Sequence, residues 1–116
     1  MKDNEGKITY KEKEYKLVFN LNVMEAIQNE YGTLDKWTEL TSGENQEVNV
    51  RALKFGYMEM LNEGLSIEAE ETNTEYKPVN EKFVGRMLTD IGLDNMTKAL
   101  QTTIIESTQT EEGKNA

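Results

Sequence analysis

The chain of 116 residues carries 22 acidic and 13 basic side chains, a net charge of −9, and contains neither cysteine nor histidine. These counts exclude disulfide bonds, thiolate nucleophiles, Cys/His zinc sites and imidazole bases, and the acidic excess disfavours nucleic acid and anionic membranes as partners. No apolar run approaches the ~20 residues of a membrane span, and the start "MKDNEGK" lacks the apolar region of a signal peptide, which predicts a cytoplasmic protein.

The first predicted elements are two strands joined as a hairpin. Apolar residues alternate with polar ones along the second strand, and the predicted buried face consists of Tyr15, Leu17, Phe19 and Leu21. This period of two is typical of a strand with one buried side. Ile8 and Tyr10 indicate the partner strand, and residues 11–14 form the predicted connection.

After Leu21 the apolar residues recur at spacings of three and four, which predicts a helix. We expect the Asn22 side chain to cap its start and Gly32 to end it. Thr33 is the expected cap of a second short helix, in which the bulky side chain of Trp37 should fill the elbow against the core. A polar loop is predicted at residues 41–46.

Residues 47–63 form the third predicted helix, and its apolar arc is wide enough for contacts on more than one side. Gly64 is the expected end of this helix. The acidic segment 65–78 is then predicted to be a long connection, which is either a solvated loop or a contact for a partner.

Two further helices are predicted before the chain becomes polar. Pro78 suits the first turn of a helix at residues 79–91, Gly92 should end it, and Asp94 should cap the last helix. The sequence therefore predicts one domain over residues 1–107 and a flexible acidic tail over 108–116. The expected fold class is α+β, mainly α, with an N-terminal β-hairpin packed on a bundle of about four to five helices.

Gly56 and Gly85 lie inside predicted helices, where each costs roughly 1 kcal/mol relative to alanine. Close approach of two helices is the usual physical reason for such a glycine. We therefore expect the helix at 47–63 to cross the helix at 79–91 near these residues, although each glycine can also be a tolerated defect.

Candidate catalytic and metal sites are weak. Glu68, Glu70 and Glu71 lack the glycine-containing Asp/Asn loop of a calcium site, and Ser42 and Ser66 have no histidine to activate them. The sequence predicts no enzyme, no catalytic residue, no cofactor and no bound metal.

A partner-binding groove is the remaining candidate site. Methionine side chains adapt to irregular apolar partners, and the last two predicted helices are joined by a short elbow that can present one groove. The predicted members of this groove are Met87, Ile91, Met96, Leu100 and Ile104. Packing in the core is the alternative, and it explains each of these residues better when they are considered singly.

The order of these segments resembles a known protein family. The hairpin and elbow "YKLVFNLNVMEAIQNEYGTLDKW", the broad helix "VRALKFGYMEMLNEGL" and the paired helices "NEKFVGRMLTDIGLDNMTKALQTTIIES" are similar to the tail assembly chaperones of long-tailed, siphovirus-type bacteriophages and prophages. The likeness covers roughly residues 8 to 107. Its most specific parts are "EYG" followed by "TLDKW" and the helix pair split at "DIGLDN", whereas the acidic segment 65–78 departs from the family pattern.

This resemblance implies a protein of the bacterial host cytoplasm that binds the long helical tape measure protein and keeps it soluble until tail tube subunits polymerise. It also implies self-association on the client and a longer frameshifted product that contacts the tail tube protein. A different reading remains open, in which the chain is a small acidic phage or mobile-element interaction protein, such as a nucleic-acid-mimic inhibitor or an adaptor.

Overall fold

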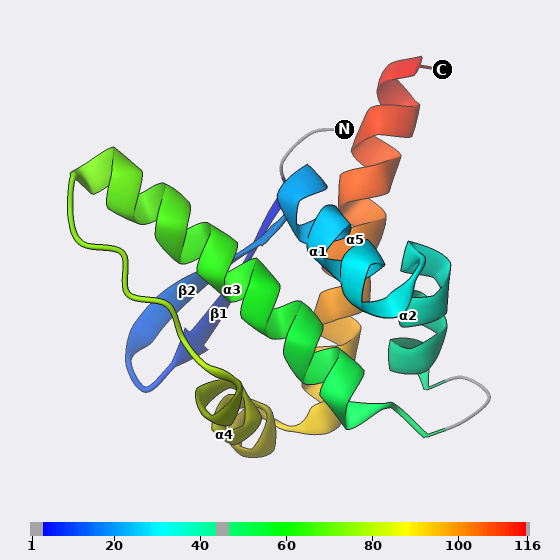
Figure 1. The fold of residues 1–116 in the computed structure, drawn as a ribbon, viewed down its shortest axis with the longest axis horizontal. Helices are drawn as coiled ribbons and strands as arrows, with labels where there is room; N and C mark the ends of the chain where they lie inside the picture. The colour runs from blue at the N-terminus through cyan, green and yellow to red at the C-terminus, as the bar shows by residue number, and fades with distance from the viewer. Residues whose placement is uncertain (1–3, 44–46, 116) are drawn as a thin grey trace.

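The computed structural model describes the backbone of residues 4–43 and 47–115 and the side chains of residues 6–43 and 47–104. This part of the chain contains one antiparallel hairpin followed by five helices (Figure 1). The predicted class, α+β and mainly α, is confirmed. The elements are β1 (Asn4–Tyr10), β2 (Lys13–Phe19), α1 (Leu21–Tyr31), α2 (Leu34–Ser42), α3 (Val50–Thr72), α4 (Glu81–Ile91) and α5 (Leu93–Asn115).

The hairpin has a tighter turn than the sequence suggests. Tyr10 pairs with Lys13, so only Lys11 and Glu12 connect the strands, and both have positive φ angles of 50° and 65°. Two central residues with positive φ match the type I′ turn that suits the right-handed twist of paired strands. Neither residue is glycine or asparagine, so the turn is formed at a conformational cost.

Replacing Glu12 with glycine is therefore expected to stabilise the protein. Glycine reaches positive φ without a clash of its side chain, so Glu12→Gly should raise the free energy of unfolding by about 1 kcal/mol. Urea denaturation followed by circular dichroism measures this change. A decrease in stability would mean that the Glu12 side chain contributes more than the strained backbone costs.

The start of α1 corrects two predictions. The N-cap is Asn20, whose side-chain oxygen accepts from the Val23 N–H at 3.2 Å, and not Asn22. Because β2 ends at Phe19 and the helix follows immediately, Leu21 lies in the first turn and is 64% exposed instead of continuing the buried face of the strand. The alternation of the strand stops at the N-cap Asn20, and from Leu21 onward the side chains follow the periodicity of the helix.

The elbow between α1 and α2 forms as predicted. Gly32 ends α1 with φ of 91°, and Thr33 caps α2 by accepting from the Lys36 N–H at 3.0 Å. Trp37 is fully buried, and its indole N–H donates to the carbonyl of Ala52 in α3 at 2.9 Å. The elbow therefore places the indole against the central helix. The loop predicted after α2 begins only at Gly43, and its residues 44–46 lie outside the described part of the chain.

The central helix α3 is longer than predicted. It continues through Gly64 to Thr72, and its C-cap Asn73 adopts the left-handed conformation with φ of 54°. Gly64 lies inside the helix and against the hairpin, where a Cβ would lie 2.7 Å from the Lys16 carbonyl oxygen, so close packing explains the glycine at this position. Most of the acidic segment that was expected to be a loop is thus the exposed end of α3, which extends beyond the other helices in Figure 1.

The starts of the last two helices differ from the prediction, since α4 begins later than expected and α5 begins earlier. Asn80 caps α4 by accepting from the Phe83 N–H at 2.9 Å, so Pro78 precedes the helix instead of forming its first turn. Gly92 ends α4 as expected, with φ of 107°. Helix α5 begins at Leu93, which places Asp94 in its first turn and not at the cap. The backbone of α5 includes most of the predicted tail at 108–116, whose flexibility stays a prediction.

All seven elements build one core. Apolar residues of the hairpin pack with the inner faces of the helices around α3, which contacts β2, α1, α2 and α4. Tyr57 of α3 is buried there and donates its hydroxyl to the Met96 carbonyl of α5, and burial raises the pKa of this phenol. The core fixes α4 against α3, with the outer face of α4 turned to solvent.

Candidate protein-binding site

The groove predicted between the last two helices is filled by the core. Met87, Met96 and Leu100 are buried and belong to the central cluster, while Ile91 and Ile104 are partly buried against it. An amphipathic helix buries its most apolar side first, so these residues hold α4 and α5 to the rest of the protein. Burial of Met87, Met96 and Leu100 in the core removes these three side chains from contact with a partner in this structure, whereas a role of the partly exposed Ile91 and Ile104 in binding stays a prediction.

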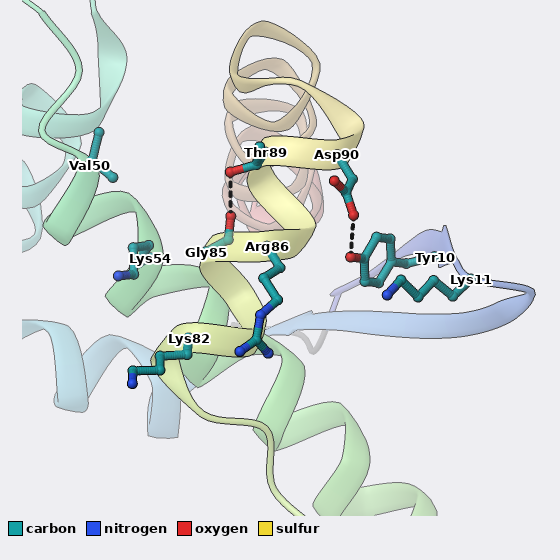
Figure 2. Close-up of a pocket in the computed structure, with 9 residues that line it drawn as sticks. All are labelled: Tyr10, Lys11, Val50, Lys54, Lys82, Gly85, Arg86, Thr89 and Asp90. Carbon is teal, nitrogen blue, oxygen red and sulfur yellow. Dashed lines mark hydrogen bonds between the residues drawn. The ribbon is translucent and has the colours of Figure 1, made fainter.

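An open hollow lies on the outer side of α4 instead (Figure 2). Lys82, Gly85, Arg86 and Thr89 follow one another at spacings of three, one and three, so they form a stripe on one face of the helix. Val50 and Lys54 of α3 flank this stripe on one side, and Tyr10 and Lys11 of the hairpin flank it on the other. The hollow has a volume of about 630 Å³, and we call it the α4 hollow.

A second, smaller hollow of about 320 Å³ overlaps the first and extends it toward the start of α5. It shares four lining residues with the α4 hollow and adds Leu88 and Leu93. Val50 and Leu93 are 52% and 42% exposed, and they are two of only four large apolar side chains exposed among the described residues. Exposed apolar surface beside a polar rim is typical of an interaction site.

The α4 hollow is cationic although the protein is acidic. Four basic residues line it, Lys11, Lys54, Lys82 and Arg86, against a single acidic one, Asp90. Within the described residues no carboxylate forms an ion pair with Lys54, Lys82 or Arg86. The lining of the hollow therefore carries an excess of positive charge.

The one carboxylate of the hollow already has a partner. The Tyr10 hydroxyl donates to Asp90 Oδ2 at 2.5 Å, which joins the hairpin to α4 (Figure 2). This hydrogen bond is the main reason why the pKa of Tyr10 is raised, with burial and the charge of Asp90 adding to it. Asp90 thus fixes one wall of the hollow.

The two glycines singled out in the sequence have different surroundings. A Cβ on Gly56 would lie 2.2 Å from the Trp37 ring, so this glycine makes room for α2 and not for α4. Gly85 does face α3, but a Cβ there would meet only the Lys54 side chain at 3.6 Å, an ordinary contact. The predicted packing of α3 on α4 is confirmed, whereas the close crossing at both glycines is wrong for Gly56.

Sequence reasoning missed the basic residues of this site. The pair Lys82 and Arg86, four residues apart with Gly85 between them, was a usable signal on a predicted helix. Lys11 and Lys54 gave none, since only the tertiary fold brings the hairpin turn and α3 to the same face. A cationic cluster of this kind is invisible in the net charge.

A third hollow, of about 140 Å³ and away from α4, contains the carboxylates of Glu59 and Glu63 beside Tyr76. Glu63 accepts hydrogen bonds from the side chains of Asn20 and Asn22 at 2.7 and 3.0 Å, which ties the start of α1 to α3. Burial, and secondarily the charge of Glu63, raises the pKa of Glu59. These contacts indicate a structural role for the pair.

Glu59→Gln is expected to stabilise the protein at neutral pH. A carboxyl group whose pKa is raised by folding binds its proton more tightly in the folded state, so stability falls as the pH rises through that pKa. The variant should be more stable than the parent at pH 7, and the difference should disappear below the ordinary pKa of 4.5. Thermal unfolding at both pH values measures this, and equal stability at pH 7 would contradict it.

Within the described part of the chain, no helix combines the length and apolar character needed to cross a bilayer. The same residues include no group of three or more acidic side chains arranged to hold a metal ion. We found no match to this chain among models of protein families, curated proteins or solved structures.

Proposed function

We propose that the chain is a tail assembly chaperone, which binds the tape measure protein of a long-tailed phage or prophage in the host cytoplasm and keeps it soluble without catalysing a reaction. The resemblance over residues 8 to 107 supplies the identity of the client. The observation that carries the proposal is the α4 hollow, where exposed Val50 and Leu93 lie beside Lys54, Lys82 and Arg86, side chains that form no ion pair with any described residue.

This combination suits a reversible contact with another polypeptide. Apolar side chains supply affinity when they are removed from water, and charges at the edge of a site guide the partner and fix its orientation. The net charge of −9 keeps the carrier and its client in solution through repulsion between copies. We expect several copies to bind one long client, so that weak single contacts add up through avidity.

Two further partnerships belong to the same proposal. Copies of the chain associate while they are bound to the client, and a longer frameshifted form contacts the tail tube protein. In such an arrangement the present chain coats the tape measure protein. The longer form recruits the tube subunits, which then take the place of the chaperone on the tape measure protein.

The exposed end of α3 favours a second candidate function. Because the helix continues to Thr72, Glu68, Glu70 and Glu71 are displayed on a rigid scaffold and not on a loop. Fixed carboxylates of this kind can imitate the phosphates of nucleic acid toward a nucleic-acid-binding protein. An inhibitor of that type would lose its effect when these three residues become lysine, and changes in the α4 hollow would leave it unaltered.

Co-expression with the tape measure protein of the same phage or prophage tests the chaperone. The measurement is the fraction of tape measure protein that remains in the supernatant after centrifugation, with an unrelated acidic protein of similar size as the control. The soluble fraction should rise several-fold with this chain and not with the control. Equal solubility in both cases would contradict the proposed function.

A further inference from the structure

No close contact among the described residues explains why position 85 is a glycine. Glycine inside a helix costs roughly 1 kcal/mol relative to alanine, and Gly56 and Gly64 offset this cost by admitting Trp37 and the Lys16 carbonyl group. Gly85 admits nothing of that kind, because a Cβ at this position would make only ordinary contact with Lys54. The position sits in the middle of the stripe that forms the floor of the α4 hollow.

Because Gly85 has no side chain, the backbone of a partner can approach the floor of the α4 hollow closely. Lys82 and Arg86 rise one turn apart on either side of Gly85, Lys54 borders it from α3, and exposed Val50 and Leu93 lie at its apolar end. Small residues flanked by larger ones are the pattern that allows two helices to pack at short distance. The hollow is therefore shaped for a rod that lies along α4, with anionic groups beside it.

From this arrangement we propose that the α4 hollow binds a helical segment of the client that carries an apolar stripe with carboxylates on both flanks. The apolar stripe packs on Gly85, Val50 and Leu93, and the carboxylates pair with Lys54, Lys82 and Arg86. This inference rests on the proposed function for the source of the helix. The 11 residues of α4 span about 16 Å, so the contact covers roughly three turns of the partner.

Other partners fit less well. The floor of the hollow is helix α4, whose backbone groups are bonded along its own axis, so the floor offers no edge for an added β-strand, whereas a helix brings its own backbone groups already satisfied. Nucleic acid would place a phosphate backbone close to a surface whose net charge is −9. A helix flanked by carboxylates matches the positive charge of the hollow. It also brings fewer negative charges near the acidic rest of the protein than a phosphate backbone would.

The direct test uses a synthetic peptide of about 18 residues, long enough to be helical when bound, with leucines at spacings of three and four and glutamates on both flanks. A second peptide has lysine in place of every glutamate. Isothermal titration calorimetry should show binding of the acidic peptide and affinity at least about tenfold lower for the basic one. The affinity for the acidic peptide should fall as salt is added.

Two variants place the binding in the hollow. Lys82→Glu with Arg86→Glu should weaken binding of the acidic peptide by about tenfold or more, and Gly85→Leu should weaken it by filling the floor while leaving the cations in place. The matched control is Lys36→Glu with Lys98→Glu, two exposed lysines on α2 and α5, which changes the net charge equally and should leave the affinity unchanged. Circular dichroism of each variant verifies that it is folded.

The outcomes separate this inference from the proposed function. Equal affinity for both peptides, or equal loss in the control and the hollow variants, would overturn the inference. If the parent chain keeps the tape measure protein soluble and folded Gly85→Leu does so equally well, the inference fails and the chaperone stands; if the parent chain has no effect on solubility, the chaperone itself fails. Sedimentation in which the parent forms oligomers and the Lys82/Arg86 variant is monomeric would assign the hollow to a second copy, and would also overturn it.

Discussion

Gly56→Ala is expected to lower the free energy of unfolding by about 3 kcal/mol. The added methyl group would lie 2.2 Å from Cζ2 and 3.0 Å from Cε2 of Trp37, so either the indole or the helix must move. Trp37 is fully buried and its N–H is bonded to the Ala52 carbonyl, and displacing it would break that bond and open the packing between α2 and α3. Overpacking of this kind costs up to about 3 kcal/mol and the broken hydrogen bond about 1 kcal/mol more, while the helix propensity of alanine offsets about 1 kcal/mol of this, so a net loss of about 3 kcal/mol is expected.

The matched control is Gly85→Ala, for which the opposite sign is expected. The methyl group makes an ordinary contact of 3.6 Å with Lys54, so the gain in helix propensity should raise the free energy of unfolding by about 0.5–1 kcal/mol. Urea denaturation followed by tryptophan fluorescence measures both variants. Similar effects of the two substitutions would contradict the different roles that we assign to the two glycines.

Gly64→Ala is expected to lower the free energy of unfolding by about 2 kcal/mol. The added methyl group would meet the Lys16 carbonyl oxygen at 2.7 Å and the carbonyl carbon at 3.3 Å. These are backbone atoms of a paired strand, since Lys16 lies opposite Lys7 in the hairpin, so no side-chain rotation relieves the contact. The hairpin must therefore shift away from α3.

Hydrogen exchange distinguishes this shift from a general loss of stability. In Gly64→Ala the amides of β2 near Lys16 should exchange faster than expected from the change in global stability, because the strand is displaced locally. Unchanged stability together with unchanged exchange in β2 would show that α3 and the hairpin have room between them, which would contradict the close packing at Gly64.

Local signals in the sequence predicted the parts of the fold that are decided locally. Gly32, Thr33 and Gly92 each act within one turn of a helix end, through a positive φ angle or a side-chain cap. The burial of Trp37 was also predicted correctly, because a large apolar side chain on the inner side of a short helix can leave water only by packing into the core.

Some helix starts were misplaced by one or two residues, as at Asn20 and Leu93, but the larger errors arise where two distant segments meet. Gly64 resembles a helix end in the sequence, but it lies inside α3, and the Lys16 carbonyl group packed against it explains why the residue is glycine. The same limit applies to the binding site. The apolar residues Met87 and Leu100 gave the strongest sequence signal because they form the core, whereas the α4 hollow depends on bringing Lys11, from the hairpin turn, and Lys54, from α3, beside α4.

Hydrogen–deuterium exchange of the chain alone and in complex with the tape measure protein tests the location of client binding most directly. If the client is held at the α4 hollow, deuterium uptake should fall on binding in α4 at residues 81–91 and in the first turns of α3 that contain Val50 and Lys54. The uptake of α2 around Lys36, on a different part of the surface, should stay the same. Protection that leaves α4 unaffected and appears elsewhere, for example at the acidic end of α3, would contradict binding at this site.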